Sequence, residues 1–210
     1  MRSLLLTLTL LLAPTVASAG QLVISVKDGT GQPVANAVVV FRPASGVHPA
    51  VEREPGVHVI TQADIHFNPF VVVAPVGSEV SFPNKDKVRH HVYSFSAAKR
   101  FELKLYGRDE TRRVVFDQPG VVSLGCNIHD QMMGFVFVTD TPYTAKTGAS
   151  GEVTLDSLPA GPGTVTVWHP FQRSRLNEVS ETLSVPAQGA GRATLAMNLR
   201  PPPEGKSPAL

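Results

Sequence analysis

The chain of 210 residues contains a single cysteine, Cys126, and this scarcity excludes any disulfide bond within the chain. Several enzyme signatures are also missing: the sequence has no Gly-rich phosphate loop, no His-Glu-x-x-His helix and no Ser/His/Asp elbow. The 19 Lys and Arg residues are nearly balanced by 17 Asp and Glu residues, which argues against nucleic acid as a partner. We therefore expect neither an enzyme nor a nucleic-acid-binding protein.

Long apolar runs are absent after the first twenty residues, which argues against a membrane span in the mature protein. The chain starts with a positive Met1-Arg2, continues with an apolar run over Leu4–Leu12 and reaches the small-residue segment Ala17-Ser-Ala19. This pattern predicts a secretory signal peptide over residues 1–19, cleaved after Ala19. We expect a soluble protein that is exported to the bacterial periplasm.

Side chains that bind metals cluster around the single cysteine. The segment reads Cys126-Asn-Ile-His129-Asp-Gln-Met132, and the apolar run Gly134–Val138 follows it. One Cys and two His in a plane with a weak axial Met form the ligand set of mononuclear blue-copper centres. A tight loop between two strands brings three such side chains to one point. The alternative for Cys126 alone is a small buried hydrophobe, but the joint spacing favours a metal site.

The remaining ligand has to come from a different strand, and His90 is the best candidate. Alternation along a strand places His90 and Val92 on one face and His91 on the other. The absence of a His-x-His pair and of a second cysteine excludes trinuclear and thiolate-bridged dinuclear copper sites. The other histidines lack metal-binding spacing, and we expect them in loops or on the surface: His48, His58, His66 and His169.

Both ligand segments resemble those of the cupredoxins. Asn84, six residues before His90, is similar to the first-ligand strand of plastocyanins, amicyanins and pseudoazurins, and Cys-x2-His-x2-Met followed by x-Gly-x-Val is most similar to the amicyanin loop. The lead-in over residues 64–82 also follows the cupredoxin pattern. The resemblance covers about residues 60–139. It implies a cupredoxin-like Greek-key β-sandwich, one-electron transfer and one mononuclear type 1 copper, with the ligands His90, Cys126, His129 and Met132.

The sequence departs from the family pattern beside the first ligand. The family usually has Asn directly after this histidine, where it helps to tie the ligand strand to the cysteine loop, and this chain has His91. Either His91 or Asn84 is left to provide that tie. Arg89 stands where the family often has Pro. A cation at this position favours Cu(I) over Cu(II) and raises the reduction potential.

Regularly spaced strand patterns indicate an all-β protein. The 18 Pro and 17 Gly residues suit many short strands separated by turns. The expected strands alternate in polarity or are rich in β-branched residues: Leu22–Val26, Ala37–Phe41, Phe70–Val73, His91–Ser96, Phe101–Tyr106, Arg112–Phe116, Val121–Leu124, Phe135–Thr139, Glu152–Leu155, Gly163–Trp168, Glu181–Val185 and Ala193–Leu199.

The sequence on either side of residues 60–139 has a different character. Residues 26–38 and 151–170 resemble pieces of transthyretin-like or carboxypeptidase-regulatory-like β-sandwiches. We expect an additional small β-sandwich formed by the flanking segments 20–59 and 140–200, and a disordered tail over residues 201–210. The alternative is one enlarged cupredoxin with extra edge strands. The combination is similar to the plastocyanin-like proteins called methylamine-utilisation proteins.

Basic residues gather in the copper-binding half. Between Phe82 and Val114, four acids stand against nine cations, which are Lys85, Lys87, Arg89, Lys99, Arg100, Lys104, Arg108, Arg112 and Arg113. They form either a solvated face or a docking patch for an acidic redox partner, such as a c-type cytochrome or a dehydrogenase. We expect His129 at the electron exit, with Met133 and Phe135 in an apolar patch around it.

The sequence leaves three functions open. The first is an exported, monomeric carrier of single electrons between redox partners. The second is a periplasmic protein that binds or delivers copper and has no electron-transfer role. The third is a structural β-sandwich whose copper site is degenerate.

Overall fold

The computed structural model describes residues 19–46 and 54–203, and within them nearly all regular structure is β-strand. The predicted signal peptide, apart from Ala19, lies outside the described residues, as do His48 and residues 204–210 of the predicted tail. The single helix in the described part is a 3₁₀ turn, Arg175–Asn177. No helix there is long and apolar enough to cross a membrane.

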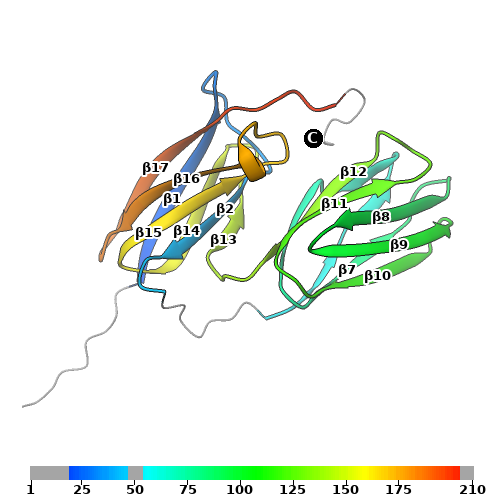
Figure 1. Ribbon diagram of the computed structural model, residues 1–210, viewed down its shortest axis with the longest axis horizontal. Coiled ribbons are helices and arrows are strands. Elements are labelled where there is room, and N and C mark those ends of the chain that lie inside the picture. The colour runs from blue at the N-terminus through cyan, green and yellow to red at the C-terminus, as the bar shows by residue number, and fades with distance from the viewer. Residues whose placement is uncertain (1–18, 47–53, 204–210) are drawn as a thin grey trace, which may run out of the picture.

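Two β-sandwiches lie side by side along the long axis of the molecule (Figure 1). The first, which we call the flanking sandwich, is built from both ends of the described chain. One of its sheets has the order β14-β1-β17 and the other has the order β13-β2-β15-β16. Its strands are β1 (Ala19–Asp28), β2 (Val38–Pro43), β13 (Thr144–Lys146), β14 (Glu152–Pro159), β15 (Gly161–Trp168), β16 (Glu178–Val185) and β17 (Ala190–Met197).

The middle of the chain forms the second unit, which we call the central sandwich. Its five-stranded sheet has the order β6-β12-β11-β8-β9 and faces the three-stranded sheet β10-β7-β3, while β4 and β5 form a short hairpin. Its strands are β3 (Val57–Val59), β4 (Thr61–Ala63), β5 (His66–Asn68), β6 (Val71–Pro75), β7 (Ser78–Pro83), β8 (His90–Ser96), β9 (Lys99–Tyr106), β10 (Thr111–Phe116), β11 (Gly120–Cys126) and β12 (Met133–Thr139). Strand β3 pairs with β7, so this sandwich begins before the predicted boundary at residue 60.

Each sandwich has its own apolar core. Leu22, Phe41 and Leu195 lie in the core of the flanking sandwich, to which both of its sheets contribute. The core of the central sandwich contains Phe82, Val92 and Val136 in the same way. Buried residues alternate with less buried ones on strands such as β8 and most of β15, and burial of one face fixes the register of such strands.

A third apolar cluster joins the two sandwiches. Phe70 and Phe135 of the central sandwich pack with Trp168 and Phe171 of the flanking sandwich. Strand β12 is therefore covered on both faces, which explains why its sequence is apolar almost throughout.

Candidate metal centre

The ends of two neighbouring strands position the candidate ligands. His90 opens β8, Cys126 closes β11, and the two strands pair so that Cys126 lies opposite Val92. The burial of β8 alternates as predicted, with His90 and Val92 buried and His91 on the outer face. His129 lies in the loop after β11, where its carbonyl accepts a hydrogen bond from the Met132 backbone N–H at 3.0 Å and closes a turn.

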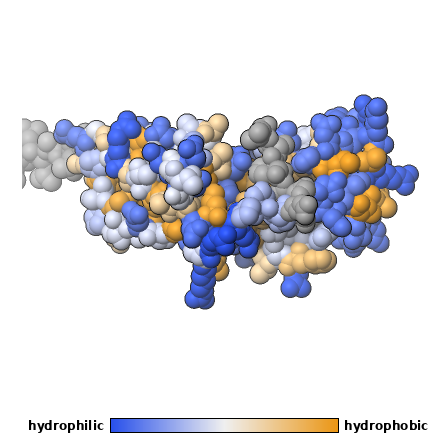
Figure 2. All heavy atoms as spheres, turned by 90° about the horizontal axis from the view of Figure 1, so that it is seen from above, coloured by the Kyte–Doolittle hydropathy of each residue, from blue (hydrophilic) through white to orange (hydrophobic). Residues whose placement is uncertain are grey.

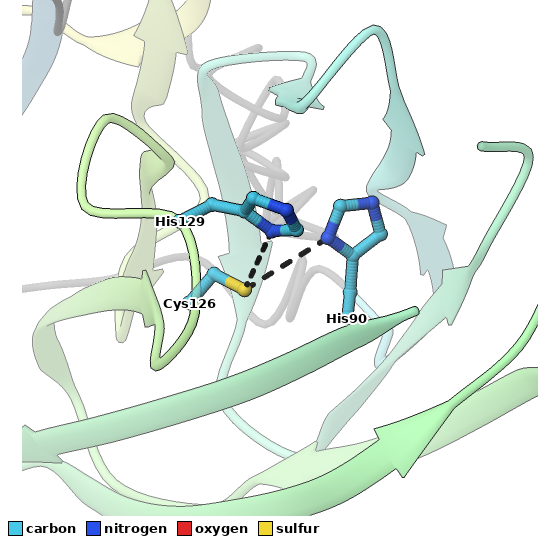
Figure 3. A group of neighbouring side chains, drawn as sticks. All are labelled: His90, Cys126 and His129. Atoms are coloured by element: carbon cyan, nitrogen blue, oxygen red, sulfur yellow. Dashed lines mark hydrogen bonds between the residues drawn. The ribbon is translucent and has the colours of Figure 1, made fainter. Parts of the chain in front are cut away.

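Three side chains from these elements converge (Figure 3). The Cys126 Sγ lies 3.8 Å from His90 Nδ1 and 3.5 Å from His129 Nδ1. The three donor atoms all lie within 4.8 Å of one another. Metal bonds to thiolate and imidazole are about 2.3 and 2.0 Å long for zinc, so one ion between the groups accommodates both sulfur–nitrogen separations. A soft thiolate with two imidazoles is a donor set that fits copper.

The surroundings of Cys126 favour its thiolate. Burial raises the pKa of the thiol, but hydrogen bonds with the His90 ring, the His91 and Ile128 backbone and the His129 ring outweigh burial and lower this pKa to about 6. A metal-binding sulfur has to be deprotonated, so the side chain is prepared for that state at neutral pH.

His90 is held through its second ring nitrogen. Its Nε2 donates a hydrogen bond to Asp86 Oδ2 at 2.7 Å, and the histidine side chain is fully buried. Burial lowers the pKa of His90, whereas its bonds to Cys126 and Asp86 raise it, and the net shift is upward. No motif in the sequence points to Asp86, which is one of the four acids between Phe82 and Val114.

Met132 is buried in the same apolar cluster as Cys126, and both line a hollow of about 420 Å³ on the surface of the central sandwich. The next residue, Met133, also lines this hollow and is partly buried against the cluster between the two sandwiches. Met132, at 2% exposed, is the more deeply buried of the two methionines.

Neither His91 nor Asn84 joins the ligand strand to the cysteine loop through its side chain. His91 Nε2 lies 2.9 Å from Glu102 Oε1 on the outer face of the sheet. Asn84 Nδ2 donates to the carbonyls of Val88 and Tyr106 and so braces the loop before β8. The link to the cysteine loop comes from the backbone, where Asn127 N–H donates to the His91 carbonyl at 3.2 Å.

The remaining histidines differ in burial. His58 and His66 lie outside the converging group, as predicted. His169 lies in the loop after β15, which agrees with the expectation of a loop or surface residue, although its side chain is only 6% exposed. The expectation for Phe135 is wrong, because this side chain is buried between the sandwiches and cannot form part of an exposed patch.

The surface of the central sandwich carries both apolar and hydrophilic side chains. Seen from above Figure 1, apolar side chains reach the surface of the central sandwich within a largely hydrophilic surround (Figure 2). Ile128, beside His129, is 49% exposed and is one of the large apolar side chains that reach solvent in this half.

No family model matches this sequence, and no curated protein matches it. Among solved structures, the purple cupredoxin from Nitrosopumilus maritimus is 23% identical over 39% of this chain and 99% of its own, with a TM-score of 0.36. A copper-containing nitrite reductase from Thermus scotoductus is 25% identical over 55% of this chain and 28% of its own, with a TM-score of 0.39. A reduced mutant of amicyanin is 20% identical over 48% of this chain and 98% of its own, with a TM-score of 0.37.

Proposed function

We propose that this protein is an exported type 1 copper protein that carries single electrons between redox partners. The convergence of Cys126 Sγ with the Nδ1 atoms of His90 and His129 carries this proposal. Copper bound there supplies a one-electron Cu(I)/Cu(II) couple. Met132, buried in the same apolar cluster as the cysteine, is proposed as the fourth residue that would hold the copper.

Each of the three converging side chains has its own role in such a site. Cys126 supplies an anionic sulfur whose ionised form the neighbouring hydrogen bonds favour. His90 is fully buried and fixed, whereas His129 is partly exposed and offers the route by which electrons enter or leave. We assign no catalytic residue. The proposed location is the periplasm, reached through the signal peptide at residues 1–19, and the flanking sandwich is proposed as an accessory unit.

The visible spectrum of the purified, Cu(II)-loaded protein tests this proposal. A short copper–thiolate bond in a trigonal site gives an intense charge-transfer band and a blue colour. Cys126→Ala should abolish the band, whereas Met132→Leu should keep it and raise the reduction potential. Oxidised protein that is colourless, or that loses copper to a mild chelator, would refute electron transfer and favour copper delivery or a degenerate site.

A further inference from the structure

The carboxylate of Asp86 lies at the meeting point of three hydrogen-bond donors. Its Oδ1 accepts from the Asp64 backbone N–H at 2.6 Å, and its Oδ2 accepts from the Ile65 backbone N–H at 3.0 Å and from His90 Nε2 at 2.7 Å. The Asp86 side chain is 11% exposed. A carboxylate with this little exposure and three hydrogen-bond donors around it differs from an ordinary acid on the surface.

The turn that supplies two of these donors has a costly backbone conformation. Asp64 and Ile65 have φ angles of 52° and 59°, in the left-handed region. This region is unfavourable for a β-branched residue such as Ile65 and persists only where surrounding contacts enforce it. Successive N–H groups in such a turn point to the same side and form a concave site for an anion. The turn between β4 and β5 is therefore shaped around the Asp86 carboxylate.

The other side of Asp86 is fixed as well. Its backbone N–H donates to Asn84 Oδ1 at 2.9 Å, and Asn84 is itself fully buried and bonded to the carbonyls of Val88 and Tyr106. The position of the carboxylate is thus determined from both directions without any contribution from a metal.

From these contacts we propose that Asp86 is the positioning residue for His90. An ionised carboxylate only accepts hydrogen bonds, so Nε2 carries a proton, and Nδ1, which faces Cys126, is the ring nitrogen left to bind a metal. The ligand is thereby oriented before copper arrives. A carboxylate on the far nitrogen also makes an imidazole a stronger donor, which favours the more highly charged Cu(II). This inference rests on the proposed copper function.

The Asp86 carboxylate should lower the reduction potential, whereas the Arg89 cation is expected to raise it. Arg89 is exposed, so solvent and salt screen its charge, whereas Asp86 is mostly enclosed and touches the ligand itself. The carboxylate should therefore dominate, and the net effect of the two charges should be a lowered reduction potential.

Replacing the carboxylate by a neutral group of the same shape tests the proposal. In the copper-loaded protein, Asp86→Asn should keep the blue band, weaken Cu(II) binding about 10- to 100-fold and weaken Cu(I) binding less. Each tenfold loss that is selective for Cu(II) raises the potential by about 59 mV. Asp130→Asn is the matched control, because it removes an equal charge next to His129 at an exposed position. Its shift in potential should be much smaller.

A second measurement uses the metal-free protein. Nitrogen-15 NMR of the imidazole groups should show a proton on His90 Nε2 that exchanges slowly with solvent, whether or not Nδ1 also shares a proton with Cys126. Asp86→Asn should speed that exchange, and Asp130→Asn should leave it unchanged. The wild-type spectrum remains informative even if the Asp86 variant folds poorly.

The outcomes separate this inference from the proposed function. An unprotonated Nε2 of His90 in the wild type, or an Asp86→Asn variant with the wild-type potential and Nε2 exchange rate, would overturn the role of Asp86 and leave the copper function intact. A protein that has the expected Nε2 proton but never turns blue would retain the positioning role and lose the electron-transfer proposal.

Discussion

The ring of Phe135 lies 5.6 Å from that of Trp168, with the two planes inclined at 66°. Phe135 is on β12, directly after the candidate ligand loop, and Trp168 ends β15 of the flanking sandwich. Phe137 makes a similar contact with the same tryptophan at 5.6 Å. The strand that follows the ligand loop is therefore held by two cores, and the flanking sandwich supports the part of the central sandwich nearest the site.

Truncating this tryptophan should destabilise the protein without changing the metal site. Trp168 is 3% exposed, and replacing such a side chain by alanine costs about 3–5 kcal/mol of the free energy of unfolding. Trp168→Ala should lower that free energy by this amount in a denaturant titration and leave the blue band in place. Leu176→Ala, at a position 70% exposed, is the control and should change it by at most about 0.5 kcal/mol. A loss below about 1 kcal/mol for Trp168→Ala would show that the sandwiches are not packed together in solution.

The two adjacent histidines on β8 should behave differently on substitution. His90 faces Cys126, and His91 faces Glu102 on the opposite side of the sheet. His90→Ala should remove the blue colour, because it removes one of three strong ligands. His91→Ala should retain a blue site, since the tie to the cysteine loop runs through the His91 backbone carbonyl, which alanine preserves. A bleached His91→Ala protein together with a blue His90→Ala protein would show that the assignment of the ligand is reversed.

Much of the strand structure could be predicted from alternation. Every strand expected from the sequence overlaps an observed one. The strand Ser78–Pro83 was missed because Ser81 is buried as well as its two apolar neighbours, Val80 and Phe82, so burial and polarity do not alternate cleanly along it. The short strands β3, β4, β5 and β13 were also missed, because three residues are too few to display a period of two.

The convergence of Cys126 with two histidines could be predicted, because one loop supplies two of these three side chains at a fixed spacing. The support for His90 could not, because the Asp86 carboxylate is held by the turn at Asp64 and Ile65, which lie 22 and 21 residues earlier in the chain. Burial of Phe135 was missed for a similar reason. A strand covered on both faces is recognisable only once its second neighbour, here the flanking sandwich, is in place.

Burial of His169 should make stability depend on pH. Burial lowers the pKa of this histidine from 6.5 to about 4, while a hydrogen bond with the Ala35 backbone opposes the shift. The unfolded chain binds the proton more readily, so the neutral side chain stabilises the fold above about pH 6.5, and this contribution is lost as the pH falls toward 4. The full contribution is about 3 kcal/mol.

In the wild type, the Phe171 backbone N–H donates to His169 Nδ1 at 3.3 Å. The variant His169→Asn isolates the effect of titration, because the Asn side chain offers an acceptor for the same N–H but does not titrate. Denaturant titrations at pH 7.5 and pH 5 should show a larger loss of stability for the wild type than for the variant. Equal losses in the two proteins would rule out His169 as the source.

The basic segment contains two kinds of cation. Lys85, Lys99, Arg108, Arg112 and Arg113 lie within ion-pair distance of acids. Lys87, Arg89, Arg100 and Lys104 have no ion pair with a described residue. Lys87 and Arg89 lie in the loop that leads to His90, so any electrostatic steering toward the site should depend on them first.

Steering should appear as a rate that depends on salt. Oxidation of the Cu(I) protein by the anionic hexacyanoferrate(III) should slow as ionic strength rises to physiological values, because charges are then screened over about 8 Å. Lys87→Glu and Arg89→Glu should each slow the reaction further at low salt. Lys99→Glu makes the same change in net charge near the opposite end of β8, beside Asp117, and should have a smaller effect. A rate that is flat in salt, or equal in the three variants, would refute a docking role and identify these cations as an ordinary solvated face.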